Sequence, residues 1–167
     1  MSYCNITGVI GENPLNLNSK EKDEVMVKLI DGLLQSGLPN MSQNVAFAIA
    51  ANVYAESSFN YTAVNSSSGA YGLCQWLGNR YTNLKTYCSQ NGCQYNTPEG
   101  QIKFLIYELQ NSEKNAYSAT VQQAANIGVC AVTFCDKFER PGHQYCVSRD
   151  KKAYYVQDRY NKIKSGG

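Results

Sequence analysis

Hydrophobic residues after position 25 recur at helical spacing and predict an amphipathic helix. The segment Asn18-Ser19-Lys20-Glu21 offers a capping residue followed three positions later by Glu, which is typical of a helix start. Gly37 marks the end of the pattern. The apolar face is formed by Met26, Leu29, Ile30, Leu33 and Leu34.

The next segment, from Gln43 to Ala55, is apolar on nearly every face. Ser42 stands in position to cap it. Because an amphipathic stripe is missing here, the pattern predicts a helix buried on all sides.

The chain then changes character, since residues 57–78 are rich in Gly, Asn and Ser. These residues predict loops with a small hairpin near Tyr61 to Val64. Helices are expected to follow from Asn79 to about Gln90, from Pro98 onward, at 117–126, at 129–138 and, capped by Ser148, at 149–163. The predicted class is mainly α, with a small irregular or β insertion after the second helix. We expect an irregular lead-in at 1–17, one domain at 18–164, and a linker or chain end at 165–167.

The charge of the chain argues against a nucleic-acid partner. Only 17% of the 167 residues are charged, the net charge is +2, and no Lys/Arg block is present. A nucleic-acid partner is therefore not expected. Tyr (13) and Asn (17) are abundant, and both side chains stack on or hydrogen-bond to sugars without needing charge, which hints at carbohydrate.

The sequence predicts neither a membrane span nor a secretory signal. The longest apolar run, near Val45 to Ala55, is interrupted by Asn52 and is short of the roughly 20 residues that cross a bilayer. The first residues lack the basic and apolar segments of a signal peptide. Export by another route and origin from a longer chain both stay open.

Seven cysteines and one histidine do not form a zinc pattern, because no Cys-x-x-Cys occurs. Cys88 and Cys93 flank a turn and could form a disulfide, and the group Cys130, Cys135 and Cys146 could supply another. We favour buried free thiols over disulfides. No metal and no cofactor are expected.

The chemically informative position is Glu56, a carboxyl group in the last turn of the predicted buried helix. Burial there would disfavour the anion, as general-acid catalysis near neutral pH requires. An outward-facing, solvated Glu56 is the plain alternative. The following segment is poor in charge and dense in Gly, amides and aromatic rings, which suits close approach to a neutral polar ligand.

At this point the sequence resembles the phage tail lysozymes, which are related to goose-type lysozymes and soluble lytic transglycosylases. The resemblance extends over roughly Leu38 to Tyr155 and includes Asn79-Arg80, Gln101 and Phe138-Glu139-Arg140-Pro141. Its most specific part is Glu56-Ser57-Ser58-Phe59-Asn60, then Ala63-Val64-Asn65, then Gly69-Ala70-Tyr71-Gly72-Leu73-Cys74-Gln75-Trp76.

The resemblance implies a lysozyme-like catalytic domain, a glycoside hydrolase of the N-acetylmuramidase type. It would cleave the β-1,4 bond between N-acetylmuramic acid and N-acetylglucosamine in bacterial peptidoglycan. By the same match Glu56 would protonate the leaving oxygen, and Asn65, Tyr71 and Gln75 would line the sugar cleft. We expect Trp76 to anchor the loop in the core. The protein would be virion-associated or delivered to the cell wall, as part of a phage tail or of a longer lysin chain.

A second carboxylate must come from far along the chain, because no Asp or Glu lies between Glu56 and Glu99. Glu139 is the preferred candidate over Glu99, Glu108 and Asp136. An ion pair of Glu139 with Arg140 or Arg149 is the structural alternative.

Three other functions stay open. A lytic transglycosylase would form 1,6-anhydro products without a second carboxylate, although Asn65 stands where those enzymes usually carry Ser. A noncatalytic glycan-binding module would suit the Tyr and Asn content. A Cys/His hydrolase using His143 lacks a nucleophile context.

Overall fold

The computed structural model describes residues 14–166, and within them the fold is built from seven α-helices without a β-strand. The predicted mainly α class is therefore confirmed. Residues 1–13 of the expected lead-in lie outside the described part. The helices are α2 (Ser19–Leu34), α3 (Gln43–Ser57), α4 (Asn79–Asn91), α5 (Pro98–Gln110), α6 (Lys114–Val121), α7 (Ile127–Phe134) and α8 (Arg149–Lys164).

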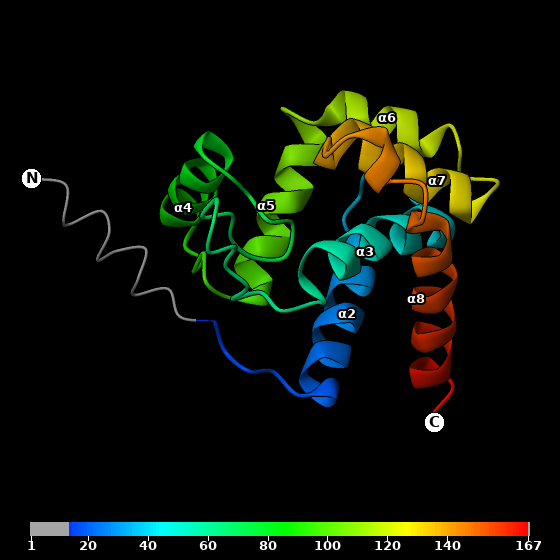
Figure 1. Ribbon diagram of the computed structural model, residues 1–167, viewed down its shortest axis with the longest axis horizontal. Coiled ribbons are helices and arrows are strands. Elements are labelled where there is room, and N and C mark those ends of the chain that lie inside the picture. The colour runs from blue at the N-terminus through cyan, green and yellow to red at the C-terminus, as the bar shows by residue number, and fades with distance from the viewer. Residues whose placement is uncertain (1–13, 167) are drawn as a thin grey trace, which may run out of the picture.

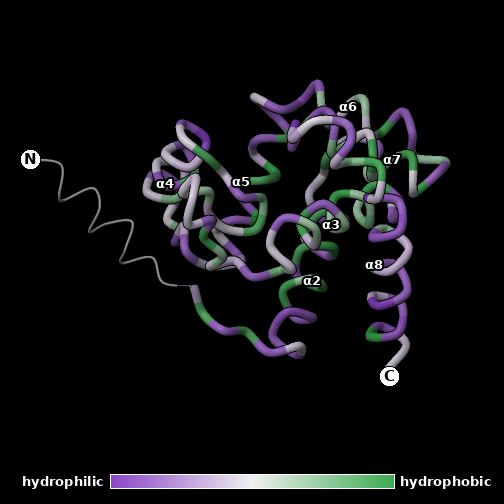
Figure 2. The backbone as a smooth tube through the Cα atoms, in the orientation of Figure 1, coloured by the Kyte–Doolittle hydropathy of each residue, from purple (hydrophilic) through white to green (hydrophobic). Residues whose placement is uncertain are grey.

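Helix α3 is the centre of the molecule. It packs against α8, α7 and α2, and its residues from Val45 to Val53 are all buried. Figure 1 shows α2 and α8 on either side of α3, with α4 and α5 beyond α2 and with α6 and α7 above. Figure 2 shows the apolar course of α3, in contrast to the hydrophilic turns of α8. The fully buried amide of α3, Asn52, donates hydrogen bonds to the carbonyls of Ala48 and Ala131, so it joins α3 to α7.

Local signals place most helix ends correctly. Asn18 and Glu21 form the predicted capping box of α2, and Ser42 and Thr97 cap α3 and α5. Helix α4 ends at a left-handed Gly92. Ser148 precedes α8 as predicted, but its side chain makes no capping hydrogen bond.

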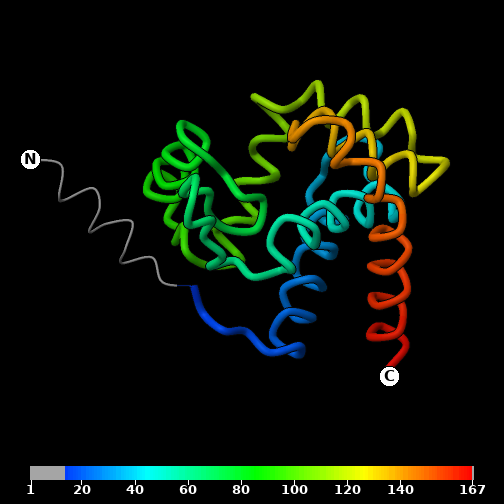
Figure 3. Tube along the Cα trace, viewed as in Figure 1, coloured from blue at the N-terminus to red at the C-terminus, as the bar shows by residue number. Residues whose placement is uncertain are grey.

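The two helices predicted at 117–126 and 129–138 lie earlier in the chain than expected. Asn126 is the N-cap of α7 and accepts a hydrogen bond from the amide of Val129, so α6 cannot extend through it. Helix α7 continues as a π-helical turn, Cys135–Glu139, which ends at a left-handed Arg140 before Pro141. The chain then crosses over the α6 and α7 region before α8 begins (Figure 3).

The insertion after α3 is a compact loop rather than a hairpin. Two isolated β-bridges, Val64 with Tyr71 and Tyr71 with Trp76, replace the expected strands. Trp76 is 1% exposed, which confirms it as the core anchor of this loop.

One disulfide, Cys135–Cys146, joins the π-helical turn to the segment before α8. Our preference for free thiols throughout is therefore wrong for this pair. The suggested Cys88–Cys93 disulfide is absent, because both are free thiols. Cys88 sits in the last turn of α4 and its thiol contacts the carbonyl of Gly100.

None of the helices in residues 14–166 combines the length and the apolar character needed to cross a bilayer.

Candidate functional site

Glu56 lies in the last turn of α3, and the backbone after it is held in an unusual conformation. Ser57 is buried, and its hydroxyl donates to the carbonyls of Val53 and Leu73 at 3.0 and 2.9 Å. Ser58 and Phe59 then both adopt positive φ angles, 53° and 63°. Consecutive left-handed residues other than glycine are costly and concentrate at functional sites. The end of α3 is thus fixed directly beside the carboxyl group of Glu56.

Arg149 binds that carboxyl group. Its Nη2 lies 3.1 Å from Glu56 Oε1, with side-chain exposures of 7% for Arg149 and 22% for Glu56. A negative charge is unfavourable at the carboxyl end of a helix, and Arg149 offsets it. Glu56 is therefore neither fully buried nor simply solvated: it is a half-buried carboxyl group paired with a buried cation.

Glu139, the last residue of the π-helical turn, is the second carboxyl group of the site. Burial and then the charge of Glu56 raise the pKa of Glu139 well above its ordinary value, against the opposing charges of Arg80 and Arg149. Its Oε1 is buried without a hydrogen-bond partner among the described residues, as are Nε and Nη1 of Arg149. Like charges in one site rarely ionise together, so the charge of Glu56 favours the protonated form of Glu139.

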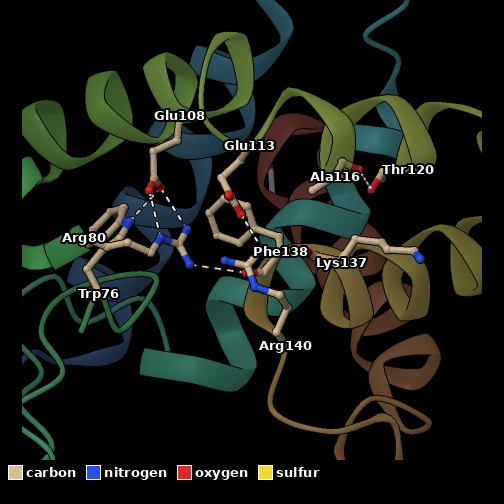
Figure 4. Close-up of polar contacts among 9 residues, drawn as sticks. All are labelled: Trp76, Arg80, Glu108, Glu113, Ala116, Thr120, Lys137, Phe138 and Arg140. Atoms are coloured by element: carbon tan, nitrogen blue, oxygen red, sulfur yellow. Dashed lines mark hydrogen bonds and ion pairs between the residues drawn. The ribbon is translucent and has the colours of Figure 1, made fainter. Parts of the chain in front are cut away.

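A buried polar network positions the backbone next to Glu139 (Figure 4). Glu108 of α5, whose side chain is 3% exposed, accepts hydrogen bonds from Trp76 Nε1 at 2.8 Å and from Arg80 at 2.9 and 3.1 Å. Arg80 of α4 also donates to the carbonyl of Phe138 at 3.3 Å, and its guanidinium lies 4.4 Å from the centre of the Phe138 ring. The network thus links the loop after α3 to the turn that carries Glu139.

Gln101 of α5 also holds the loop after α3 in place. It is fully buried, accepts a hydrogen bond from the amide of Leu73, and donates to the carbonyls of Tyr61 and Tyr95. Gly72 has φ +80°, and a Cβ there would lie 2.7 Å from the Gln101 oxygen. Glycine is required at this position both for its backbone conformation and for the close approach.

Two of the three residues that the resemblance assigns to the sugar cleft hold the loop together. Asn65 is exposed, and its Oδ1 accepts from the amides of Ser67 and Ser68. Gln75 donates through Nε2 to the carbonyls of Ala63 and Gly72.

The third, Tyr71, is 2% exposed, and its ring stacks on Tyr81. A ring so placed supports the loop from inside. Sugar contact by Asn65, Tyr71 and Gln75 stays a prediction.

The other acids considered from the sequence have partners of their own. Glu99 pairs with Lys28 at the surface, Asp136 pairs with His143, and Glu108 belongs to the network above. Neither arginine proposed as a partner makes an ion pair with Glu139. Arg140 binds Glu113 instead, and Arg149 binds Glu56.

A Cys/His hydrolase has no support at this site. The cysteines flanking His143 are joined in the Cys135–Cys146 disulfide. Cys74 lies near Glu139, but burial, followed by the charge of Glu139, raises the pKa of its thiol well above the ordinary value. A buried, protonated thiol is a poor nucleophile.

Sequence reasoning missed the roles of Arg80 and Arg149 in this site, although both residues fall within the resemblance. The signal that was present for Arg80 is the charge itself, since Asn79-Arg80 follows a loop that is otherwise short of charge. Arg149 is 93 positions away from Glu56, and no local pattern joins them.

Comparison with known families gives a match over most of the chain. The family model described as phage tail lysozyme matches residues 25–162. A comparison with curated protein sequences gives no match. The family match indicates a lytic enzyme of the lysozyme type that acts on peptidoglycan.

Replacing Arg80 with Met should destabilise the protein strongly, because Glu108 would keep a buried charge without its cationic partner. We expect a loss of about 3 kcal/mol in the free energy of unfolding, measured by chemical denaturation. The control is Lys28→Met, which removes a pair in which both side chains are more than half exposed and should cost at most about 1 kcal/mol. Equal losses in the two variants would contradict the structural role of the network.

Glu139 should make the protein less stable as pH rises. A carboxyl group whose folded-state pKa is raised binds its proton more tightly in the native state, so stability falls from about pH 4.3, the ordinary pKa of Glu, up to the raised value. Denaturation curves of Glu139→Gln should show a flatter pH dependence between about pH 5 and 8 than the wild type.

Glu99→Gln provides the control for this pH series. The hydrogen bond from Lys28 lowers the pKa of Glu99, so this residue titrates below the measured range. Its replacement should leave the slope unchanged. A slope in Glu139→Gln equal to that of the wild type would show that Glu139 is ionised at ordinary pH.

Proposed function

Since this chain belongs to the phage tail lysozyme family, we propose that it hydrolyses the β-1,4 bond between N-acetylmuramic acid and N-acetylglucosamine, with Glu56 as the general acid. The observation that carries the proposal is the electrostatic interaction of Glu56, at the end of α3, with Glu139, in the π-helical turn, where Arg149 and Arg80 supply the opposing charges. Most glycosidases use two carboxyl groups, which lie in different environments and have different roles.

Glu56 suits the role of proton donor by position. Its backbone belongs to a helix buried on all sides, whereas its side chain is 22% exposed and open to a substrate. Arg149 holds this carboxyl group at 3.1 Å, so the acid is fixed in the position from which it would protonate the glycosidic oxygen.

Glu139 would interact with the attacking water. Its raised pKa means that it already carries a proton in the resting enzyme, so orienting the attacking water suits it better than removing a proton at the outset. Arg149, through its bond to Glu56, is a positioning residue that holds the acid and balances the charge left after proton transfer.

The same property of Glu139 favours a second candidate function, that of a lytic transglycosylase. In that reaction the 6-hydroxyl of the muramic acid attacks instead of water, and Glu56 serves first as acid and then as base. A second carboxylate is not required, so a Glu139 that stays protonated would not impede it.

The loop from Asn65 to Gln75 would form one wall of the sugar site. Asn65 is exposed and Gln75 is half-buried, so the Nδ2 of Asn65 could donate to a sugar oxygen and the Oε1 of Gln75 could accept from a sugar hydroxyl or N-acetyl N–H. Tyr71 would act indirectly by supporting this wall. In the phage tail, such an enzyme would open the bacterial cell wall locally.

The first functional prediction concerns Glu56→Gln, which keeps the size of the side chain but removes the transferable proton. Clearing of a suspension of purified cell walls should slow by at least about two to four decades. Glu99→Gln, which removes a carboxylate paired with Lys28 at the surface, should clear the suspension at the wild-type rate. A folded Glu56→Gln protein that clears normally would rule out Glu56 as the acid, and binding of cell walls without any wild-type cleavage would favour a glycan-binding module.

The second functional prediction separates hydrolysis from anhydro ring formation. Mass spectrometry of the released fragments should show reducing muramic acid ends, heavier by one water than 1,6-anhydro ends. If Glu139 orients the water, Glu139→Gln should slow hydrolysis by roughly two decades or more. Anhydro products, together with a Glu139→Gln rate close to that of the wild type, would instead identify a lytic transglycosylase.

A further inference from the structure

A groove lies between α4 and α5, on residues that the proposed catalytic site does not use. It encloses about 420 Å³, within the range of small-molecule sites. None of its nine lining residues is charged: four are amides, two carry hydroxyl groups and three are aromatic. The residues on which the inference rests are Asn91, Asn111, Tyr87, Phe104 and Tyr107.

The aromatic rings form a platform with one open side. The ring centres of Tyr87 and Tyr107 are 4.8 Å apart, and that of the buried Phe104 is 5.6 Å from Tyr87. Tyr107 is 44% exposed. An exposed tyrosine on an aromatic floor offers an apolar face for the C–H side of a sugar ring and a hydroxyl for its polar edge.

Two amides at the rim are held in fixed orientations. Asn91 donates from Nδ2 to the carbonyl of Tyr87 at 2.8 Å, and Asn111 donates in the same way to Tyr107 at 2.9 Å. Each exposed side chain keeps its oxygen as an acceptor and its second N–H as a donor. Paired donors and acceptors of this kind match sugar hydroxyls and acetamido groups.

The groove is physically connected to the loop beside Glu56. Phe104, on its floor, makes an edge contact with Trp76 at 5.5 Å between ring centres. Helix α5 therefore contributes one face, with Gln101 and Glu108, to the loop and its network, and a neighbouring face, with Phe104, Tyr107 and Asn111, to the groove.

We propose that this groove is a second glycan-binding site, which holds a neutral chain of N-acetylated amino sugars away from the point of cleavage. The absence of charge from the lining argues for a neutral saccharide over an ionised peptide or a nucleic acid. Only the kind of sugar rests on the proposed function. A site of this kind would keep the enzyme on its insoluble substrate between cleavage events.

The test uses the full chain carrying Glu56→Gln, so that binding is measured without cleavage, and a trimer of N-acetylglucosamine as the probe. Side-chain amide signals of Asn91 and Asn111 in NMR spectra should shift and saturate as the trimer is added. Tyr107→Ala should raise the dissociation constant reported by these amides about tenfold, because the stacking face is lost. Tyr107→Phe keeps the stacking face and loses only the hydroxyl, so it should raise the dissociation constant far less than Tyr107→Ala does.

Tyr154→Ala is the matched control, since Tyr154 is 49% exposed on α8 and does not line the groove. It should leave binding unchanged. If Tyr107→Ala does not fold, Asn111→Leu at the exposed end of α5 tests the rim instead. It should raise the dissociation constant of the trimer to a similar degree.

Unshifted Asn91 and Asn111 signals would overturn the proposal, and so would a dissociation constant that neither substitution changes. Cleavage does not enter the measurement. Failure of Glu56 as the acid would therefore leave the groove result standing, and failure of the groove would leave the Glu56 assignment standing.

Discussion

The buried ion pair between Glu108 and Arg80 is the interaction on which the site depends. It joins three parts of the chain: the loop after α3 through Trp76, helix α5 through Glu108, and the π-helical turn through Phe138. A buried ion pair contributes little net stability, but loss of one partner leaves a costly charge behind. The pair therefore acts mainly by allowing one arrangement of these segments, the arrangement that brings Glu139 to the end of α3.

The charges around Glu56 follow from this arrangement. Two carboxyl groups and two guanidinium groups share a partly enclosed space, and their influence on Glu139 is opposed: burial and Glu56 raise its pKa, while Arg80 and Arg149 lower it. Arg149 compensates Glu56 directly, whereas Glu139 has an oxygen without a partner among the described residues. The two acids are thereby placed in unequal environments, and unequal environments give two similar side chains different tasks.

Features that depend on neighbouring residues were predictable from the sequence. The all-apolar pattern of α3, the capping box at Asn18 and the capping Ser42 each specify a local structure, and each is found. The expectation that Trp76 lies in the core is also confirmed, because a lone Trp among apolar residues is best accommodated there. Glu56 was recognisable as unusual for the same reason: it ends a segment that is otherwise apolar.

The sequence alone does not predict which distant residues come into contact. It also does not predict which of two equally favourable local structures forms. The bond from Arg149 to Glu56 spans 93 positions, and the choice of Cys135 and Cys146 over Cys88 and Cys93 for the disulfide depends on which segments fold together. Asn126 could extend one helix or cap the next, and the cap prevailed. The amide of Gln75 is equally suited to a sugar and to the loop, and in the structure it binds the loop.

The proposed chemistry depends on the effect of Glu56 on Glu139, and an NMR titration of the Glu139 carboxyl carbon measures this effect most directly. With ¹³C-labelled glutamate in the wild-type protein, the Glu139 signal should titrate well above the ordinary range for Glu, and Glu56→Gln should move that titration to lower pH because one like charge is removed. A Glu139 signal that titrates in the ordinary range, and that Glu56→Gln leaves in place, would contradict the account.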